Sequence, residues 1–256
     1  MRMQAGVCSR AGQRGDNEDA FVVDVGQGLF TVADGVGGYE GGGVASRLVV
    51  RAVSEVLAQP PGDGVEPAER LGEALRVANR QVHQRRRGRL ALMGSTVAAL
   101  LVDGGAAVVG HVGDSRVYRL REGRLECLTR DHTVGAQLAA AGVDGSAQAH
   151  VLTRALGTYP VVAPELRLAT ARRRDVFLLC TDGLSGALRE GEMARLMRAL
   201  APAQAARALA ARAVAAGASD DVTALVVRPG GAAVGSRPAR PGLPGCQSSA
   251  RTPAFG

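Results

Sequence analysis

The chain has 256 residues, 46% of them hydrophobic, which is enough to bury the core of one domain and leaves little for a second. The net charge of +7 rests on 31 basic residues, all arginine, but no segment pairs them with stacking aromatic residues, so we expect no nucleic-acid partner. The longest apolar run, residues 97–102, is too short to cross a bilayer, no signal peptide is visible, and the four cysteines form no C-x-x-C pair, so we expect a reduced, cytoplasmic protein without membrane insertion.

The first half of the chain predicts two strands, two helices and a run of four strands. The strands at 20–25 and 28–33 are joined by a Gly-Gln-Gly turn. Apolar residues recur at helical spacing over 44–57 and 68–84, on either side of a loop rich in Pro and Gly. Strands are then predicted at 95–102, 106–112, 116–120 and 124–128. Gly-Gly and Glu-Gly pairs between them are typical of hairpin turns.

The second half predicts a flap, two further strands, two helices and a closing strand. A helix at 133–141 and a polar loop at 143–148 make up the predicted flap, 133–150. The later elements are strands at 165–169, 176–181 and 222–227, with alanine-rich helices at 192–200 and 203–216. This order favours stacked sheets with helices outside, an α/β sandwich, over a parallel βαβ fold.

The composition changes near Pro229. The last segment, 229–256, is rich in Gly, Pro, Ser and Arg and shows no periodicity. We therefore expect one domain over 1–228, followed by a disordered tail.

Four aspartates stand out by their positions: Asp19, Asp34, Asp182 and Asp220. We expect at least three of them to follow a buried strand. A carboxylate in such a place is costly to desolvate unless a cation meets it. Asp34 and Asp182 are each followed by glycine, which lets the backbone turn so that a carbonyl can point the same way. A single D-G pair is usually a turn, but four aspartates together favour a site for Mg²⁺ or Mn²⁺.

Eight short motifs between residues 9 and 227 then identify a family. In chain order they are R-G-D-N-E-D, D-G-V-G-G, M-G-S-T, V-G-D-S-R-V-Y, L-T-R-D-H-T, V-L-T-R-A-L-G, T-D-G-L and S-D-D-V-T. Together they resemble the motifs of bacterial metal-dependent serine/threonine protein phosphatases of the type 2C (PPM) family. The resemblance implies the four-layer α-β-β-α sandwich of that family, with two mainly antiparallel sheets flanked by helices.

The resemblance also implies a two-metal centre of Mn²⁺ or Mg²⁺. In it, Asp34 would bridge both ions, the Gly35 carbonyl would bind one of them, and Asp182 and Asp220 would hold the other. Asp114 matches the position that some bacterial members use, together with Asp182, for a third and weaker ion.

Three further residues carry implied roles around this centre. Arg14 matches the arginine that binds the substrate phosphate, and its planar fork suits two phosphate oxygens. Glu18 and Asp19 would orient metal-bound waters without touching the ions. The implied activity is that of a phosphoprotein phosphatase, a phosphoric monoester hydrolase in signalling. A metal-activated water would attack phosphoserine or phosphothreonine in line, without a phosphoenzyme.

The chain departs from the family pattern at two informative places. Some members carry a histidine after D-G as a candidate general acid, whereas this chain has Val36. The family usually has D-N where this chain has Asp220-Asp221, and the register assigns the ligand to Asp220. The four histidines lie apart along the sequence, and for His132 in D-H-T we expect a structural hydrogen-bonding role.

The resemblance implies phosphorylated proteins as partners, among them a bacterial serine/threonine kinase and its substrates, and a monomeric enzyme. Two alternatives remain open at this stage. One is a metal-free regulatory or binding module on the same fold, which the retained Asp34, Asp182 and Asp220 disfavour. The other is a phosphatase of an anti-sigma-factor antagonist, whose relatives usually lack an intact R-x-x-N-E-D motif and carry sensor domains.

Overall fold

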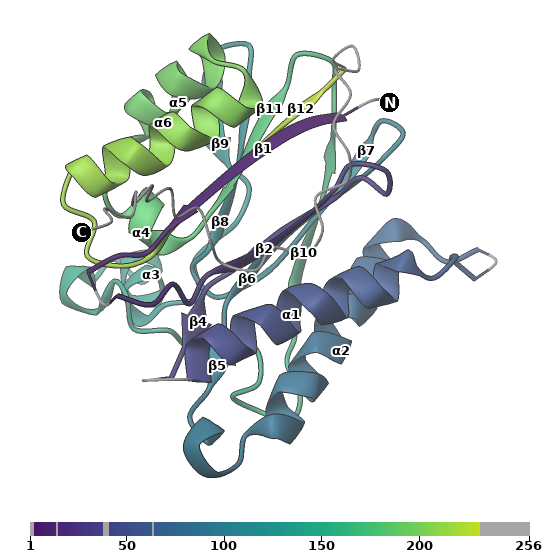
Figure 1. Ribbon diagram of the computed structural model, residues 1–256, viewed down its shortest axis with the longest axis vertical. Coiled ribbons are helices and arrows are strands. Elements are labelled where there is room, and N and C mark those ends of the chain that lie inside the picture. Colours follow the sequence, from purple (N-terminus) through teal and green to yellow (C-terminus); the bar gives the residue numbers. More distant parts are fainter. Residues whose placement is uncertain (1–2, 14, 38–40, 63, 231–256) are drawn as a thin grey trace, which may run out of the picture.

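Two antiparallel five-stranded sheets pack face to face, with helices on both outer faces (Figure 1). The computed structural model describes residues 3–13, 15–37, 41–62 and 64–230. The first sheet has the spatial order β1 (Met3–Arg10), β12 (Val222–Pro229), β11 (Val176–Cys180), β8 (Arg116–Arg121) and β9 (Arg124–Cys127). The second has the order β10 (Glu165–Thr170), β7 (Ala106–Val112), β6 (Val97–Asp103), β3 (Leu29–Ala33) and β2 (Ala20–Asp24). A short pair, β4 (Gly35–Val36) and β5 (Gly94–Ser95), extends from its end.

The helices form the two outer layers. Helices α1 (Gly41–Ala58) and α2 (Pro67–Arg85) cover the second sheet, and a 3₁₀ turn, Gly88–Leu90, follows them. Helices α5 (Glu190–Ala199) and α6 (Pro202–Ala215) cover the first sheet. The α-β-β-α sandwich expected from the sequence is therefore confirmed. No helix in the described ranges combines the length and apolar character that a membrane span needs.

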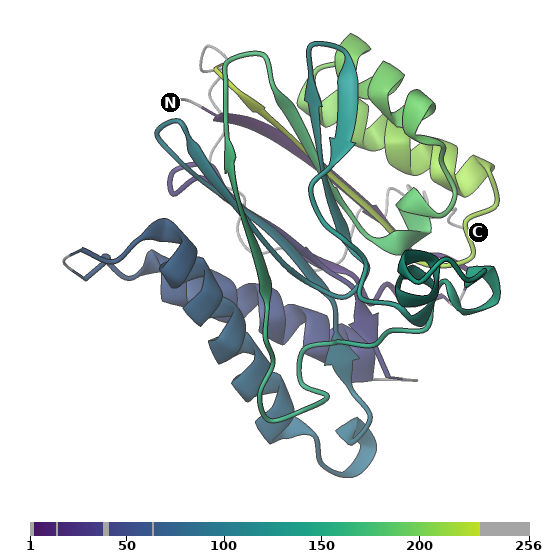
Figure 2. The ribbon, with the colours of Figure 1, turned by 180° about the vertical axis from the view of Figure 1, so that it is seen from behind.

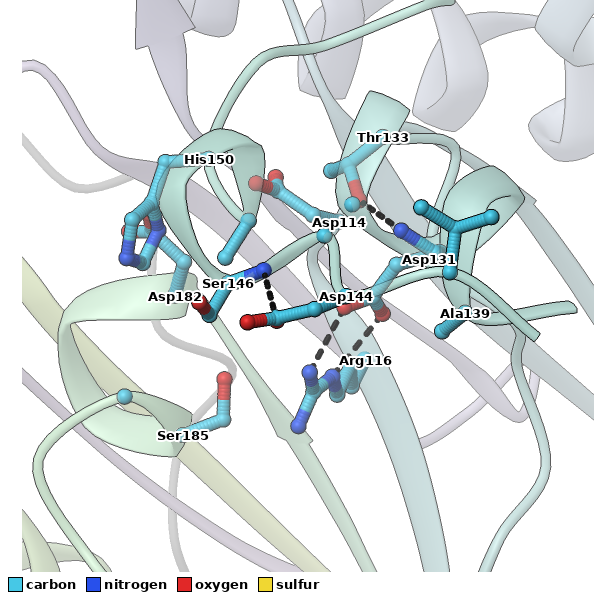
Figure 3. A pocket seen from close by; sticks show the side chains of 16 residues that line it. Asp114, Arg116, Asp131, Thr133, Ala139, Asp144, Ser146, His150, Asp182 and Ser185 are labelled. Carbon is cyan, nitrogen blue, oxygen red and sulfur yellow. Dashed lines mark hydrogen bonds and ion pairs between the residues drawn. The ribbon is translucent and has the colours of Figure 1, made fainter. Parts of the chain in front are cut away.

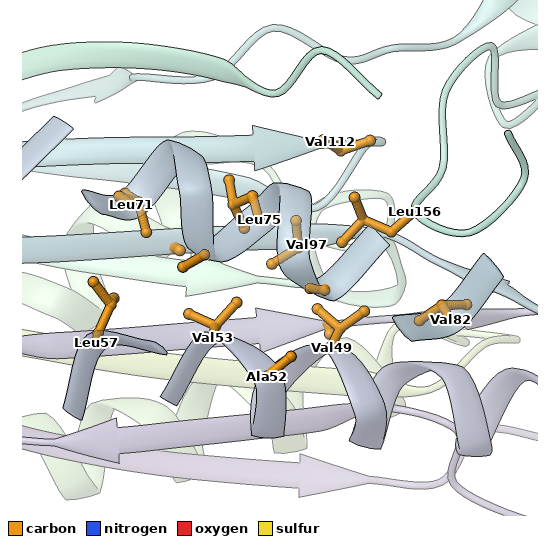
Figure 4. Packing of buried hydrophobic residues seen from close by; sticks show 14 of the residues in the cluster. Val49, Ala52, Val53, Leu57, Leu71, Leu75, Val82, Val97, Val112 and Leu156 are labelled. Atoms are coloured by element: carbon orange, nitrogen blue, oxygen red, sulfur yellow. The ribbon is translucent and has the colours of Figure 1, made fainter. Parts of the chain in front are cut away.

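Three apolar layers hold the sandwich together, and aliphatic residues dominate them because the chain is poor in aromatics. On α1, Val49, Val53 and Leu57 follow one another at four-residue spacing and so share one face. Figure 4 shows this face packed toward Leu71 and Leu75 of α2. The layer between the sheets is built from fully buried side chains such as Phe30, Leu100, Phe177 and Leu179. The strands β3 and β11, buried along their whole length, form a rigid base for the residues that follow them.

Strand β1 and helix α4 (Asp182–Ser185) are among the elements that were not anticipated from the sequence. Strand β1 pairs along its whole length with β12, but its side chains are mostly half-buried and lack a clear apolar alternation. Helix α4 begins at Asp182 itself and has four residues, too few for a periodic pattern.

The expectation that at least three aspartates follow a buried strand is wrong. Asp34 follows β3, and Asp182 comes shortly after β11. Asp19 and Asp220 instead lie just before β2 and β12. Because neighbouring strands are antiparallel, the end of one strand lies beside the start of the next, so all four aspartates still come to the same end of the sandwich.

The flap segment folds as a short helix and a turn. Helix α3 (Val134–Ala140) is capped by Thr133, whose Oγ1 accepts from the Ala136 amide at 3.1 Å, and a 3₁₀ turn covers Ser146–Gln148. A β-bridge between Thr133 and Leu152 closes the segment at its base. Figure 2 shows this dark teal segment at the end of the sandwich next to α4. The predicted tail is described only up to residue 230, so its disorder lies outside the described residues, and the domain limit at 228 stays a prediction.

Candidate metal centre

Five aspartates meet at one end of the sandwich. Asp34 lies between β3 and β4, and the carboxylates of Asp19, Asp182, Asp220 and Asp114 are close enough to act on it electrostatically. Burial raises the pKa of Asp34 well above its ordinary value, and the four neighbouring negative charges raise it further. The structure thus brings together all the aspartates singled out from the sequence, from five separate segments of the chain. Arg14, the expected phosphate-binding residue, lies outside the described residues.

The pKa values of Asp19, Asp114 and Asp182 are raised too. Burial raises the pKa of Asp19 to about 8, against the lowering effect of two threonine hydroxyls. Burial, followed by the charge of Asp182, raises the pKa of Asp114 to about 7. For Asp182 the causes are burial and then the charge of Asp220. These side chains form a concentrated negative site that stays fully ionised near neutral pH only if cations enter it.

Two oxygen atoms in this site lack a hydrogen-bond partner among the described residues. They are Oδ1 of Asp19 and Oδ1 of Asp182, both buried. An unmet buried carboxylate oxygen is costly, and a divalent cation or the water it holds would satisfy it. Because carboxylate and carbonyl oxygens are the donors that Mg²⁺ and Mn²⁺ prefer, the residues present fit such ions.

The backbone of Asp34 is held by the M-G-S-T motif. The Asp34 amide donates to Thr96 Oγ1 at 3.0 Å, while the Thr96 amide (2.8 Å) and the Ser95 hydroxyl (2.9 Å) donate to the Asp34 carbonyl. Thr96 Oγ1 also lies 2.7 Å from Ser115 Oγ, next to Asp114. The motif therefore ties two of the carboxylate-bearing loops to each other.

Two glycines allow α1 to approach this loop. A Cβ atom at Gly35 would lie 2.2 Å from the Gly42 backbone. A Cβ atom at Gly42 would lie 2.7 Å from both the Gly35 carbonyl oxygen and Glu18 Oε2. Contacts this short do not occur, so the glycine-rich segment is needed for close packing around the carbonyl predicted to bind a metal.

Glu18 and Asp19 are positioned by different elements. Glu18 Oε1 accepts from the Gly43 amide in the first turn of α1 at 3.2 Å, where the helix dipole favours a negative charge. Asp19 Oδ2 accepts from the hydroxyls of Thr181 (2.9 Å) and Thr223 (2.6 Å). The two threonines lie within the T-D-G-L and S-D-D-V-T motifs, but the sequence alone did not reveal that they hold Asp19. With Oδ2 fixed, Oδ1 is the free acceptor of that side chain.

The neighbouring pair Asp220-Asp221 divides into two roles. Asp221 is buried, and its carboxylate accepts from the amides of Gly12 at 2.8 Å and Glu18 at 2.6 Å. Asp220 acts electrostatically on Asp34 and Asp182. The extra charge at position 221 is therefore used to hold the β1–β2 loop, which favours Asp220 as the metal-facing member.

A pocket of about 440 Å³ opens beside Asp114 and Asp182, between the flap and α4 (Figure 3). The flap contributes Thr133, Ala139, Ser146 and His150 to its lining, and Ser185 of α4 lies opposite. Arg116 also lines the pocket, but its guanidinium is bound by both carboxylate oxygens of Asp131, at 2.6 and 2.8 Å. The pocket gives an extended ligand direct access to the aspartate cluster.

The histidines are less isolated in space than along the chain. The rings of His111 and His132 stack with their centroids 4.5 Å apart. His132 Nδ1 accepts from the Gly113 amide at 3.2 Å, in line with its expected structural role. His150 Nδ1 lies 3.6 Å from Asp182 Oδ2, a contact that sequence reasoning missed because no motif connects the two residues.

Comparison with known proteins agrees with this geometry. The family model "Protein phosphatase 2C" matches residues 8–216. Serine/threonine protein phosphatase PstP of Mycobacterium tuberculosis is 34% identical over 223 residues, which are 83% of this chain and 42% of PstP. The chain thus spans less than half the length of that relative. Serine/threonine phosphatase stp of Listeria monocytogenes is 29% identical over 83% of this chain and 88% of its own length.

The fold comparison gives the same result. A crystal structure of the catalytic domain of PstP in complex with two manganese ions superimposes with a TM-score of 0.81 at 32% sequence identity. The match covers 88% of this chain and 97% of that one. With its motifs, sheet order and aspartate cluster all in agreement, the chain belongs to the protein phosphatase 2C family.

Proposed function

We propose that this protein is a metal-dependent phosphatase that hydrolyses phosphoserine and phosphothreonine in proteins. The observation that carries the proposal is the convergence of five aspartates at one end of the sandwich, with buried carboxylate oxygens left unmet. A negative cluster of this kind repels a phosphate group unless cations neutralise it first. Membership of the 2C family and the two manganese ions in the PstP structure support the same activity.

We assign the ligands from the family motifs, supported by the charges that act within the aspartate cluster. Asp34, which the charges of the four other clustered aspartates reach, would be the ligand common to both ions, and Gly35 would contribute its carbonyl. Asp182 and Asp220, whose charges interact, would hold the second ion. Asp114 is the candidate for a third. Mn²⁺ or Mg²⁺ fits this all-oxygen set of ligands.

When bound, the ions would polarise the phosphoryl oxygens and lower the pKa of a water. The chain's own residues position the reactants. Asp19, fixed through Oδ2, offers Oδ1 as an acceptor that can orient water, and Glu18 is anchored beside it at the start of α1. We assign phosphate binding to Arg14, whose guanidinium can donate to two phosphate oxygens at once.

The leaving group receives no proton from the position after D-G. Val36 has no ionisable group, so the proton for the departing serine or threonine oxygen has to come from solvent or from another side chain.

Several finer features belong to the same proposal. We assign the catalytic domain to residues 1–228, with the flap at 133–150 shaping the choice of protein substrate. Phosphorylated proteins are the partners, including a serine/threonine kinase that the enzyme would oppose. We propose that it acts as a monomer in the cytoplasm.

Hydrolysis of a phosphothreonine peptide tests the proposal. The purified chain should release phosphate only when Mn²⁺ or Mg²⁺ is added, EDTA should abolish the activity, and Asp34→Asn should remove it. Asp103→Asn is the matched control, because Asp103 is an exposed aspartate at the end of β6. Hydrolysis that persists in EDTA or in Asp34→Asn contradicts the proposal. Phosphopeptide binding without hydrolysis at any metal concentration would favour the regulatory module instead.

A further inference from the structure

Three side chains from separate parts of the chain meet at the mouth of the flap pocket. They are Asp114 from the β7–β8 loop, His150 from the flap and Asp182 at the start of α4. One potential ligand atom from each lies within 4.8 Å of the other two. Figure 3 shows His150 beside Asp182, with Asp114 near them in the same pocket. Such a spacing allows one ion to contact all three.

The three side chains differ in burial: the two carboxylates lie deeper in the pocket than the imidazole. Asp114 is 7% exposed, the Asp182 side chain is 22% exposed, and the His150 side chain is 76% exposed. The carboxylates form the floor and the imidazole lies at the rim. Oδ1 of Asp182 is buried and has no hydrogen-bond partner among the described residues. The floor therefore contains a buried acceptor oxygen that a cation or a hydrogen-bond donor would stabilise.

The contact between His150 and Asp182 does not supply the missing hydrogen bond to the Asp182 carboxylate. Its length of 3.6 Å, from Nδ1 to Oδ2, is too long for a hydrogen bond. The imidazole is near the carboxylates without being bound to them, so a ring nitrogen remains available.

The other basic side chain in the pocket lining is already engaged. Arg116 donates to both oxygens of Asp131 and to the Tyr118 hydroxyl. The basic side chains in the lining of the described pocket are Arg116 and His150. Its acidic side chains are Asp114, Asp131, Asp144 and Asp182. With Arg116 committed to Asp131, the pair Asp114 and Asp182 has no full counter-charge.

We propose that His150 is a nitrogen ligand from the flap to the ion held by Asp114 and Asp182. This inference rests on the proposed function and concerns the third, weaker ion of that centre. An imidazole favours Mn²⁺ over Mg²⁺, because Mg²⁺ prefers oxygen ligands. The site therefore binds Mn²⁺ selectively, although the oxygen ligands of the other two ions accept either metal.

Binding at this site also fixes the flap. His150 is next to Val151, whose carbonyl accepts from the Val134 amide at 2.8 Å, and the Thr133–Leu152 bridge follows. A ligand at position 150 is thus connected directly to the base of the flap. Occupancy by Mn²⁺ would hold the flap over the pocket in the position described.

Pulsed EPR of the Mn²⁺-loaded, untagged chain tests the inference. Every other predicted ligand of the centre is an oxygen atom, so nitrogen hyperfine coupling to Mn²⁺ is a specific sign of His150. The coupling should appear as the weakest site fills and should disappear in His150→Gln. The matched control is His83→Gln, since His83 contacts the Gly157 carbonyl away from the pocket.

A binding titration gives the second readout. His150→Gln should weaken the weakest Mn²⁺ binding step by at least about tenfold, while Mg²⁺ binding changes little. His83→Gln should leave both unchanged. The inference is overturned if nitrogen coupling is absent at saturating Mn²⁺, if it survives in His150→Gln, or if the weakest step is unaltered.

The same samples separate this inference from the proposed function. If two Mn²⁺ ions bind and the phosphopeptide is hydrolysed without nitrogen coupling, His150 is no ligand and the phosphatase proposal stands. If the chain binds no Mn²⁺ and hydrolyses nothing, the phosphatase proposal is wrong and the inference fails with it.

Discussion

Two clusters that combine histidine with carboxylate lie on either side of the Gly113–Asp114 loop, and they differ in how their polar atoms are met. In the cluster of His111, His132 and Glu165, His111 Nε2 lies 2.8 Å from the Arg130 carbonyl, and His132 uses both ring nitrogens, Nε2 at 3.2 Å from Glu165. In the cluster of Asp114, His150 and Asp182, His150 Nδ1 lies 3.6 Å from Asp182 Oδ2, too far for a hydrogen bond, and the buried Oδ1 of Asp182 has no hydrogen-bond partner among the described residues.

The difference separates a structural cluster from a functional one. In the first, Arg154 Nη1 also lies 3.3 Å from His132 Nε2, so a guanidinium already occupies the position that a cation would need. Burial lowers the pKa of His111 and of His132, which keeps both rings neutral. In the second cluster, burial raises the pKa of both aspartates. Polar groups that protein atoms satisfy stabilise a fold, whereas groups left unmet at a pocket point to a ligand.

The largest expected effect is the pH dependence of the metal-free protein. The pKa values of Asp19 (about 8) and Asp114 (about 7) are raised above the unfolded value of 3.8, so the folded state binds more protons between these limits. Their contribution is therefore present at low pH and is lost as pH rises through 7 to 8. In EDTA, the Tm should fall by about 10 °C or more between pH 5 and pH 8.

Mn²⁺ supplies the control for this measurement. When Mn²⁺ is saturating, the ion increasingly replaces the lost protons as counter-charge as pH rises, so the Tm should fall much less over the same range. The lowered pKa of His132 acts in the opposite direction and opposes folding only as pH falls below about 6.5. A metal-free Tm that rises steadily from pH 5 to pH 8 would contradict the raised aspartate pKa values.

The second prediction concerns Asp182→Asn, which should lower hydrolysis and raise metal-free stability together. If Asp182 is a metal ligand as proposed, its loss should reduce kcat/KM by at least about a hundredfold. The amide also removes a buried charge that Asp220 repels, so the Tm in EDTA should rise by about 2–4 °C. Phosphopeptide kinetics and differential scanning fluorimetry check the two effects. A variant that is less stable than the parent in EDTA would mean that the Asp182 carboxylate stabilises the metal-free fold.

Much of this organisation could be predicted from the sequence because its signals are local. Strand β11 is a continuous apolar run and β3 is interrupted only by Thr31, and the D-G pairs that follow Ala33 and Thr181 mark their ends. Family motifs then identified the aspartates that the fold brings together. The expected sandwich needed no long-range information beyond the order of strands and helices.

The remaining features depend on contacts between residues far apart in the sequence. His150 reaches Asp182 only because the flap folds back toward α4, and nothing in the local sequence of either residue encodes that return. The stacking of His111 on His132 likewise depends on the path between β7 and the flap. Strand β1 was missed because its half-buried side chains are recognisable as a strand only once β12 lies beside them.

The third prediction concerns His132 in the cluster of His111, His132 and Glu165, whose polar atoms already have partners. In His132→Asn, the side-chain oxygen can replace Nδ1 as the acceptor for the Gly113 amide, whereas His132→Gln places its polar atoms near Glu165 instead. A buried donor left unmet costs about 1–3 kcal/mol, so Gln should destabilise the protein more than Asn by about that amount. Urea unfolding measures the difference. Equal destabilisation by the two variants would mean that the Gly113 contact adds nothing.

The smallest effect is expected for Glu165→Gln. Glu165 is the exposed member of the cluster that it forms with His111 and His132. Its side chain is 47% exposed, and water screens its 3.2 Å contact with His132. Exposed pairs of this kind contribute about 0–1 kcal/mol, and the glutamine can still hydrogen-bond the ring. Unfolding in urea should therefore shift by less than about 1 kcal/mol, and Mn²⁺ affinity should stay at the parent value. A marked loss of Mn²⁺ binding would mean that both clusters serve the metal centre and that hydrogen-bond satisfaction does not distinguish them.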